Sequence, residues 1–258
     1  MNGFLQQAVA EAERRVAQWR QEGLLEKLPA RPTARDFVAA LRRHGPGAVI
    51  AEIKRASPSR GVICSDCDVV RRATHYEQGG AAAISVLTES RWFGGSLEDL
   101  TTVRAATTLP VLRKDFVVDE YDLRVTAGIG GDAVLLIVAG LTQPRLTELL
   151  AITRELGLQA LVETHSADEL QVALDAGAEL VGVNARNLRT LEVDGTGALE
   201  LLSRVPASCL RVLESGVRAR ADVEAAIAAG ADAVLVGEAL MQAADPLARL
   251  RELTGASP

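Results

Sequence analysis

The stretch IAEIKRASPSRG, residues 50–61, begins with the pattern of a buried strand and ends in a turn-rich run. Glu52 and Lys54 interrupt the apolar residues of this predicted strand. Because strand side chains alternate, both charged side chains point to one face and Ile53 points to the other. Charges on the inner face of a buried strand are unfavourable unless they are paired or functional. The stretch therefore indicates a strand end with either a structural ion pair or a functional site.

The same order of strand, loop and helix recurs along the rest of the chain. Near-continuous apolar runs predict parallel strands over residues 49–54, 82–87, 110–114, 132–138, 159–163, 179–184, 210–214 and 232–237. Amphipathic helical segments, such as residues 143–156 and 219–229, lie between them. This pattern predicts an α/β fold, a (β/α)8 TIM barrel. An open doubly wound sheet is the alternative, but no G-x-G-x-x-G fingerprint follows the first strand.

Helical periodicity precedes the first strand. Apolar residues recur at helical spacing over residues 2–22, and a second short helix is expected from near Thr33 to the glycine-proline break at residues 45–47. We therefore expect a single domain over residues 1–258, with an N-terminal helical extension over 1–47 and a barrel over 48–258. Within the barrel, GDAVL at residues 131–135 returns as ADAVL at residues 231–235, which agrees with repeated units.

Composition favours a cytoplasmic enzyme that acts on a small molecule. The net charge of −6 offers no basic surface for nucleic acid or an anionic membrane, and 3% aromatic residues are too few for base stacking. No apolar run approaches the ~20 residues of a membrane span, and the N-terminus has no secretory signal pattern. Three cysteines, an odd number, suggest reduced thiols. We expect a monomer or a weak homo-oligomer.

Charged and polar residues gather at the predicted carboxyl ends of the strands, where such barrels hold their functional sites. They are Glu52 and Lys54 on the first strand, Lys114 on the third, Glu163 on the fifth, Asn184 on the sixth, Glu214 and Ser215 on the seventh, and Glu238 after the eighth. One such charge is more often structural than catalytic, but this many at one end of separate strands predict an active site.

The loops after the seventh and eighth strands carry a second signal. Ser215-Gly216 and Gly237-Glu238 each open a segment that we expect to be helical. Small residues and helix N-termini let backbone N–H groups approach an anion, and these two loops form the recurring phosphate site of such barrels. The pattern predicts a small phosphorylated substrate.

No metal or cofactor site is expected. The histidines His44, His75 and His165 are scattered, and His165 is predicted to lie in a loop. Cys64 and Cys67 have C-x-x-C spacing, but a zinc site needs about four ligands and no others lie nearby in the sequence. We interpret both thiols as incidental, with reversible oxidation as the alternative.

With these residues assembled, the chain resembles the indole-3-glycerol phosphate synthase family. The resemblance rests on IAEIKRASPSRG (50–61), GAAAISVLT (80–88), FGGSLEDL (93–100), PVLRKDFV (110–117), AVLLIVA (133–139), GVNARNL (182–188), ESGV (214–217) and AVLVGEALM (233–241). These stretches run in family order across the whole barrel. The resemblance implies closure of 1-(2-carboxyphenylamino)-1-deoxyribulose 5-phosphate to indole-3-glycerol phosphate, with loss of carbon dioxide and water and without a cofactor.

The resemblance also implies residue roles. Lys114 is similar to the family's general acid and Glu163 to its general base, while Glu52 and Lys54 match its first-strand catalytic pair. The remaining catalytic matches are Asn184, Glu214 and Ser215, and the substrate and phosphate matches are Ser57, Phe93, Phe116, Leu135, Arg186, Gly216, Gly237 and Glu238. We further expect Lys114, beside Phe116, to be partly desolvated with a lowered pKa, as a proton donor near neutral pH needs.

Two other functions fit the same residues less well. A strand-end lysine beside a phosphate site also suits a Schiff-base phosphosugar aldolase. A phosphosugar-binding paralogue without catalysis is the non-enzymatic alternative, and the presence of both Lys114 and Glu163 argues against it.

The interpretation of the two thiols as incidental predicts that they are dispensable. Replacing Cys64 and Cys67 together by serine should leave kcat and KM near their wild-type values, because neither thiol is expected to bind metal or substrate. Steady-state kinetics and metal analysis of the wild-type protein measure this. A large loss of activity, or stoichiometric bound metal, would refute it.

Overall fold

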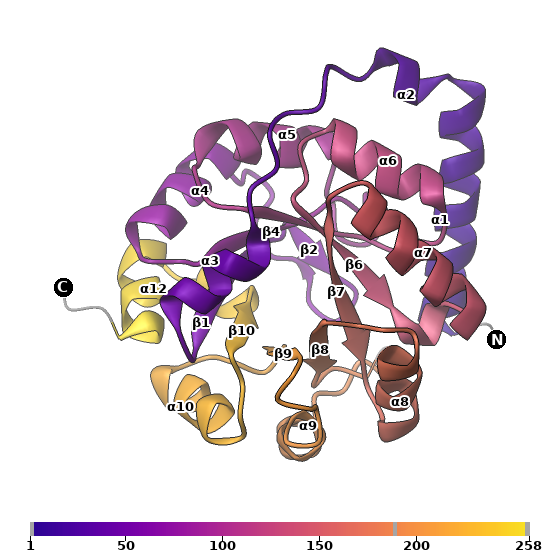
Figure 1. The fold of residues 1–258 in the computed structure, drawn as a ribbon. Coiled ribbons are helices and arrows are strands. Elements are labelled where there is room, and N and C mark those ends of the chain that lie inside the picture. The colour runs from indigo at the N-terminus through magenta and orange to yellow at the C-terminus, as the bar shows by residue number, and fades with distance from the viewer. Residues whose placement is uncertain (1–2, 188–189, 256–258) are drawn as a thin grey trace.

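A computed structural model describes residues 3–187 and 190–255 and contains a closed parallel barrel. Eight strands pair in the order β1-β10-β9-β8-β7-β6-β5-β4, and helices surround them (Figure 1). The prediction of a (β/α)8 TIM barrel is therefore confirmed, and that of a doubly wound sheet is excluded. The barrel strands are β1 (Ala48–Ile53), β4 (Ala83–Leu87), β5 (Val111–Lys114), β6 (Ala133–Ile137), β7 (Gln159–Thr164), β8 (Leu180–Asn184), β9 (Leu210–Glu214) and β10 (Ala233–Val236).

Helices precede the barrel and cover its outer surface. They are α1 (Phe4–Gln21), α2 (Leu24–Lys27), α3 (Phe37–His44), α4 (Val69–Gln78), α5 (Leu97–Ala106), α6 (Glu120–Gly128), α7 (Gln143–Glu155), α8 (Ala167–Asp175), α9 (Gly195–Leu202), α10 (Arg220–Ala228), α11 (Glu238–Met241) and α12 (Pro246–Thr254), with a 3-10 turn η1 (Val138–Gly140). In the part of the chain that the structure describes, no helix is long and apolar enough to cross a membrane.

Two local predictions need correction. The second helix, α3, begins at Phe37 and not near Thr33, because Asp36 is its N-cap and accepts a hydrogen bond from the N–H of Ala39. The run after β1 is not only a turn, since β2 (Ala56–Ser57) and β3 (Gly61–Val62) form an antiparallel hairpin. The predicted start of the first helix at residue 2 and the end of the GVNARNL stretch at residue 188 lie outside the described residues.

The alternation along β1 divides the core into two layers. Val49, Ala51 and Ile53 belong to the apolar layer between the strands and the surrounding helices. Ala48 and Ile50 belong to the interior of the barrel. Glu52 continues the inward series, and it is buried. The prediction that its charge faces inward is therefore confirmed.

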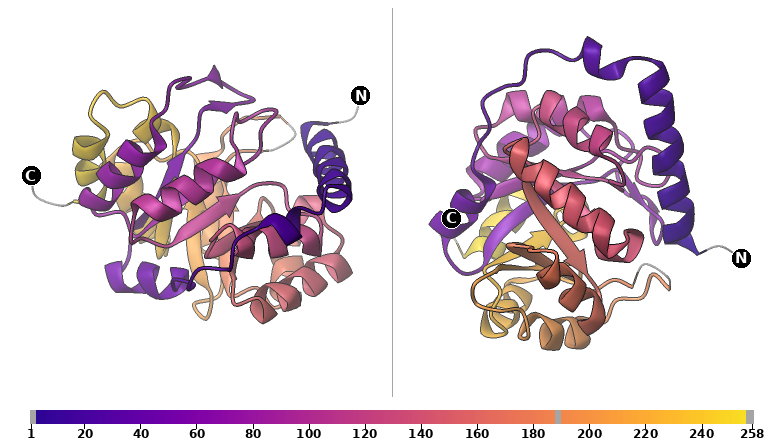
Figure 2. Two further views of the ribbon diagram at one scale, coloured as in Figure 1. Left: turned by 90° about the horizontal axis from the view of Figure 1, so that it is seen from above. Right: turned by 45° about the vertical axis from the view of Figure 1, so that its right-hand side comes forward.

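The N-terminal segment contacts the barrel at two places. Phe37 and Leu41 of α3 pack on residues at the starts of several strands, such as Ala48 and Ala133, and so cover the amino end of the barrel. The long helix α1 runs along the side, beside α6, as Figures 1 and 2 show. Its first residues reach the opposite end, where Phe4 packs near the aromatic residues that follow β4 and β5.

The repeated GDAVL and ADAVL motifs have a structural explanation. The N–H of Val111 donates to the side chain of Asp132 at 2.8 Å, and the N–H of Asp132 donates back to the carbonyl of Val111 at 2.9 Å. Arg211 and Asp232 make the same two bonds at 2.8 and 2.9 Å. Each aspartate therefore ties the start of its own strand to the start of the preceding one.

A buried charge cluster joins β5 to α1 and α6. Arg113 is fully buried and points outward from the barrel, where it contacts Asp115 at 2.9 Å and Asp122 at 3.3 Å. Arg15 of α1 contacts the same two carboxylates at 2.8 and 3.1 Å. Thr88 donates a further hydrogen bond to Asp115. The cluster thus holds the extension against the strand that carries Lys114.

Removing one cation from this cluster should destabilise the protein strongly. Arg113→Met should lower the free energy of unfolding by about 3–5 kcal/mol, because it leaves two buried carboxylates with one cation. Arg124→Met is the matched control, since Arg124 is half exposed and lies 4.0 Å from Glu120, and it should cost at most about 1 kcal/mol. Urea denaturation measures both, and equal losses would contradict the importance of the cluster.

Candidate active site

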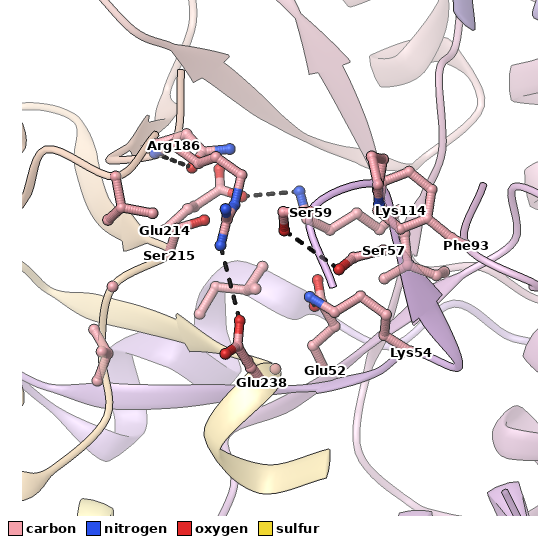
Figure 3. Close-up of a pocket in the computed structure, with 18 of the residues that line it drawn as sticks. Glu52, Lys54, Ser57, Ser59, Phe93, Lys114, Arg186, Glu214, Ser215 and Glu238 are labelled. Atoms are coloured by element: carbon pink, nitrogen blue, oxygen red, sulfur yellow. Dashed lines mark hydrogen bonds and ion pairs between the residues drawn. The ribbon is translucent and has the colours of Figure 1, made fainter. Parts of the chain in front are cut away.

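One pocket of about 360 Å³ opens at the carboxyl ends of the strands. The structure brings every residue of the predicted site into its lining. They are Glu52, Lys54, Ser57, Phe93, Lys114, Phe116, Leu135, Glu163, Asn184, Arg186, Glu214, Ser215, Gly216, Gly237 and Glu238. Figure 3 labels several of them. The place of the pocket agrees with the position of active sites in such barrels, and the role of each residue remains a prediction.

The buried charges of this pocket come from alternate strands. Glu52 lies on β1, Lys114 on β5, Glu163 on β7 and Glu214 on β9. Interior side chains of such barrels form layers of four from alternate strands. We call this set the charged layer. The preceding inward residues on the same strands form the apolar floor, which consists of Ile50, Leu112, Leu161 and Val212.

Lys114 lies between two carboxylates. Its Nζ is 3.2 Å from Oε2 of Glu163 and 3.0 Å from Oε2 of Glu214. Both carboxylates are almost fully buried, and so the ammonium is their main compensation. The three groups therefore titrate as a unit, in which a change on one changes the charge on the others.

The pKa of Lys114 is raised, so the expectation of a lowered pKa is wrong. Burial lowers the pKa of this ammonium, but the carboxylates of Glu214, Glu163 and Glu52 together outweigh burial. The sequence stretch around Lys114 offered the aromatic neighbour Phe116 and no acidic partner at the inner face. The partners come from other strands, and sequence proximity did not reveal them.

The two carboxylates beside Lys114 differ in proton affinity. Burial raises the pKa of Glu214 to about 7, with Glu163 adding to this and Lys114 opposing it. Burial also acts on Glu163, but Lys114, His165 and Asn184 outweigh burial and lower its pKa. Of the two carboxylates, Glu214 therefore binds a proton more readily near neutral pH, and Glu163 favours the ionised form.

Glu52 and Lys54 form an ion pair on the first strand. Lys54 Nζ lies 2.7 Å from Oε1 of Glu52, as the sequence predicted for two residues on one face (Figure 3). The pair needs the glycine that follows β10. A Cβ atom on Gly237 would lie 2.1 Å from Oε1 of Glu52 and 3.2 Å from Nζ of Lys54. Gly237 therefore leaves the space that the side chains of Glu52 and Lys54 occupy.

Loops around the mouth of the pocket contribute further charges. Glu238 lies 2.8 Å from Arg60 of the β2–β3 hairpin. It also lies 3.9 Å from Arg186 after β8, as Figure 3 shows. The N–H of Arg186 donates to the side chain of Asn184 at 3.0 Å. Arg218 and Arg249 line the same pocket, and the sequence reading missed both. The mouth of the pocket therefore carries several arginines. Among the residues predicted for the site, Glu238 is the carboxylate that pairs with them there.

The loop after β9 differs from its prediction. Ser215 (φ 66°) and Gly216 (φ 81°) both have left-handed backbone conformations, and α10 begins only at Arg220. Ser215-Gly216 therefore forms a sharp turn and does not open a helix. Gly237 is the N-cap of the short helix α11, as predicted.

Aromatic and aliphatic side chains form one wall of the pocket. The rings of Phe93 and Phe116 lie 6.4 Å apart, and Leu135 lines the same pocket. Phe4 of α1 packs edge-on against Phe116 at 5.9 Å and also lines the pocket. The sequence reading assigned Phe4 only to the buried face of a helix, because helical periodicity does not show which core a face meets.

Glu89 is a further residue of the pocket that the sequence pattern did not reveal. It is buried after β4, and its carboxylate accepts hydrogen bonds from the N–H groups of Arg91, Trp92 and Phe93 at 2.7 to 3.1 Å. Glu89 thereby shapes the loop that presents Phe93 to the pocket. A lone glutamate after a strand gave no signal of this role.

The two thiols of the C-x-x-C pair lie outside the pocket. Cys64 and Cys67 are free and line a separate cavity between the segment that leads into α4, α4 itself and the start of α12. Burial raises the pKa of Cys67, which disfavours the reactive thiolate. Over residues 3–187 and 190–255, no group of three or more His, Cys, Asp or Glu side chains is placed to hold a metal ion.

Comparisons with known proteins point to one family. A family model described as indole-3-glycerol phosphate synthase matches residues 5–253. The chain is 51% identical to indole-3-glycerol phosphate synthase 2 of Streptomyces coelicolor, over 99% of this chain and all of that protein. It is 52% identical to indole-3-glycerol phosphate synthase of Mycolicibacterium smegmatis, over 90% of this chain and 85% of that protein.

Solved structures support the architecture. A 3-hexulose-6-phosphate synthase is similar with a TM-score of 0.64 at 18% identity, over 81% of this chain and 99% of that chain. A mutant tryptophan synthase alpha-subunit of Pyrococcus furiosus is similar with a TM-score of 0.62 at 18% identity, over 82% of this chain and 99% of that chain. At this identity, the likeness concerns the barrel fold alone.

The space made by Gly237 gives a test of the ion pair on β1. Gly237→Ala should lower kcat at least about tenfold, because the added methyl group displaces the carboxylate of Glu52. Gly195→Ala is the matched control, since a Cβ atom there meets nothing within 4 Å. Steady-state kinetics distinguish the two variants. If Gly237→Ala raised only KM, the residue would serve substrate binding alone.

Proposed function

The chain belongs to the indole-3-glycerol phosphate synthase family, and from that premise we propose its reaction and the roles of its residues. The enzyme converts 1-(2-carboxyphenylamino)-1-deoxyribulose 5-phosphate to indole-3-glycerol phosphate with loss of carbon dioxide and water, as a step of tryptophan biosynthesis. The observation that carries the assignment is the contact of Lys114 with both Glu163 and Glu214, beside an apolar wall.

Lys114 serves as the general acid of ring closure. Closure joins an aromatic carbon to the ketone carbon of the substrate, and the ketone oxygen gains a proton as the bond forms. The raised pKa of Lys114 keeps the ammonium fully protonated until then. Protonation of Glu214, whose pKa is about 7, removes one carboxylate that stabilises the ammonium. Proton release from Lys114 is then easier, and so Glu214 tunes the acid.

Glu163 serves as the general base of dehydration. This step removes a proton from the ring and expels a hydroxyl group as water, so it needs a base and an acid together. Glu163 is held ionised by Lys114 and His165, and a protonated lysine lies 3.2 Å away. Asn184, Ser215 and the Glu52–Lys54 pair complete the catalytic set around these two residues.

The substrate has two anionic ends and one aromatic ring, and the pocket has matching features. Backbone N–H groups around Gly216 and Gly237 bind the phosphate, with Arg186 and Ser57 nearby in the same lining. Lys54 holds the carboxylate until it leaves as carbon dioxide. The anthranilate ring packs on the apolar wall of Phe93, Phe116 and Leu135. Glu238 orients Arg186 at the mouth.

The Schiff-base aldolase is less well supported. A lysine that forms a Schiff base attacks as the neutral amine, and its pKa is lowered by desolvation or by a neighbouring cation. Lys114 has the opposite environment, with carboxylates on both sides. A non-catalytic paralogue would not need three buried carboxylates around a buried ammonium, which is a costly arrangement for binding alone.

The remaining expectations concern the whole protein. We propose that residues 1–258 act as one domain, with residues 1–47 as an extension of a barrel over residues 48–258. The partner is a small phosphorylated molecule and not nucleic acid, the protein is a monomer or a weak homo-oligomer, and it acts in the cytoplasm.

The separate roles of the two lysines can be tested with methionine, which keeps the length of the side chain. Lys114→Met should lower kcat at least about 100-fold while a substrate analogue still binds, because the acid is lost and the apolar wall and the phosphate loops remain. Lys54→Met should weaken binding of analogues that carry the carboxylate more than of analogues that lack it. Fluorescence of the indole product measures the first effect, and analogue titrations measure the second.

Two outcomes would require a different assignment. If Lys114→Met lost affinity for the carboxylate and Lys54→Met bound normally without turnover, the two roles would be exchanged. If borohydride with a ketose phosphate trapped the substrate covalently on Lys114, the reaction would be that of an aldolase.

A further inference from the structure

His165 lies just outside the pocket, directly behind one of the residues that line it. It follows β7 in the loop before α8, and its ring Nε2 is 3.4 Å from Oε1 of Glu163. We propose that His165, held by Glu169, is a positioning residue whose imidazolium fixes the orientation and charge of the Glu163 carboxylate. The proposal rests on the proposed role of Glu163 as the general base.

Glu169 fixes the histidine ring from the opposite side. Its Oε2 accepts the backbone N–H of His165 at 2.8 Å and lies 3.1 Å from the ring Nδ1. The side chain of His165 is 12% exposed, that of Glu163 is 2% exposed and that of Glu169 is 23% exposed. The order from solvent to pocket is therefore Glu169, His165 and Glu163, with the imidazole between two carboxylates.

The protonation state of the ring follows from this order. A neutral imidazole has one N–H and one lone pair, so one of its nitrogens would direct a lone pair at a carboxylate. The imidazolium carries an N–H on each nitrogen and a positive charge. Oε1 of Glu163 and Nε2 of His165 are both buried, and neither has a hydrogen-bond partner among the described residues. The two atoms lie 3.4 Å apart, and a proton on Nε2 places the positive charge of the ring beside the carboxylate.

The charges around the ring agree with a cation. Glu163 of β7, Glu169 of α8 and Glu214 of β9 all act on His165, while Lys114 of β5 lies on the far side of Glu163. Burial lowers the pKa of His165, but the hydrogen bond to Glu169 and the charges of these carboxylates outweigh burial and raise it. His165 is therefore a cation over a wider pH range than a free histidine.

Two cations then hold the two oxygens of Glu163. Lys114 contacts Oε2 at 3.2 Å, and His165 faces Oε1 at 3.4 Å. The carboxylate cannot rotate without losing one of them, and its pKa stays low. When Lys114 gives its proton to the substrate, His165 remains to keep Glu163 ionised for the next step. The charge of His165 thus keeps Glu163 ionised after Lys114 has lost its proton.

Proton affinities measured by NMR test the contact without any need for turnover. The chain has three histidines, so each ring can be assigned by its glutamine variant. The pKa of His165 should exceed the usual value of about 6.5, with both ring nitrogens protonated below that pKa. Glu163→Gln and Glu169→Gln should each lower this pKa by about one unit, because each removes one facing charge. An unchanged pKa in Glu163→Gln would overturn the proposal.

Kinetics test whether the contact serves the reaction. His165→Gln keeps a hydrogen-bond donor but has no charge, and it should lower kcat about tenfold with KM changed less than about twofold. Wild-type kcat should fall to that lower level as pH rises through the NMR pKa of His165, and His165→Gln should lack this step. His75→Gln, on α4, is the control and should match the wild type in kcat and in its pH profile.

The outcomes separate this proposal from the proposed function. Loss of thermal stability in His165→Gln with unchanged kcat, or a rise in KM alone, would mean a structural or binding role and would overturn it. Absence of indole-3-glycerol phosphate formation by the wild type would refute the proposed function instead. The NMR titrations would still report whether the charge of Glu163 raises the pKa of His165.

Discussion

The closure of the barrel brings four charges from four separate strands into one plane. Glu52, Lys114, Glu163 and Glu214 occupy inward positions on alternate strands, above the apolar floor of Ile50, Leu112, Leu161 and Val212. The floor excludes water from below, so each charge must be compensated by its neighbours in the layer. Glycines beside the charged layer leave space for its side chains. A Cβ atom on Gly182 would lie 2.1 Å from Oε1 of Glu214, as one on Gly237 would from Glu52.

The outer side of the same strand has its own compensated cluster. Along β5, Leu112 and Lys114 point inward, and Arg113 between them points outward to Asp115 and Asp122. Arg15 brings α1 to that cluster, and Phe4 of the same helix reaches the wall of the pocket. The strand β5 therefore connects the position of Lys114, the attachment of the N-terminal extension and the apolar wall. This is the physical reason to treat the extension as part of the site.

Sequence periodicity predicted the eight strands to within two residues, and the strand ends together with the family resemblance identified residues that line the pocket. It succeeded because parallel strands end at one edge, so that strand ends far apart in sequence meet in space. It did not predict quantities that depend on the distance between strands. The raised pKa of Lys114, the fit of Gly237 around Glu52 and the approach of Phe4 all arise from neighbours distant in sequence. The start of α3 was missed because Asp36 and Thr33 are both good N-caps.

Asp132 and Asp232 tie neighbouring strands together with the same pair of hydrogen bonds, four units apart. Both lie at the amino end of the barrel, opposite the pocket. The same pair of bonds thus occurs twice at the end that aligns the strands, whereas the loops that surround the pocket at the other end differ from one strand to the next. Substitutions that change the reaction at the mouth leave these ties intact. Residues at the pocket can therefore change, and substrate specificity with them, while the strand register that closes the barrel stays the same.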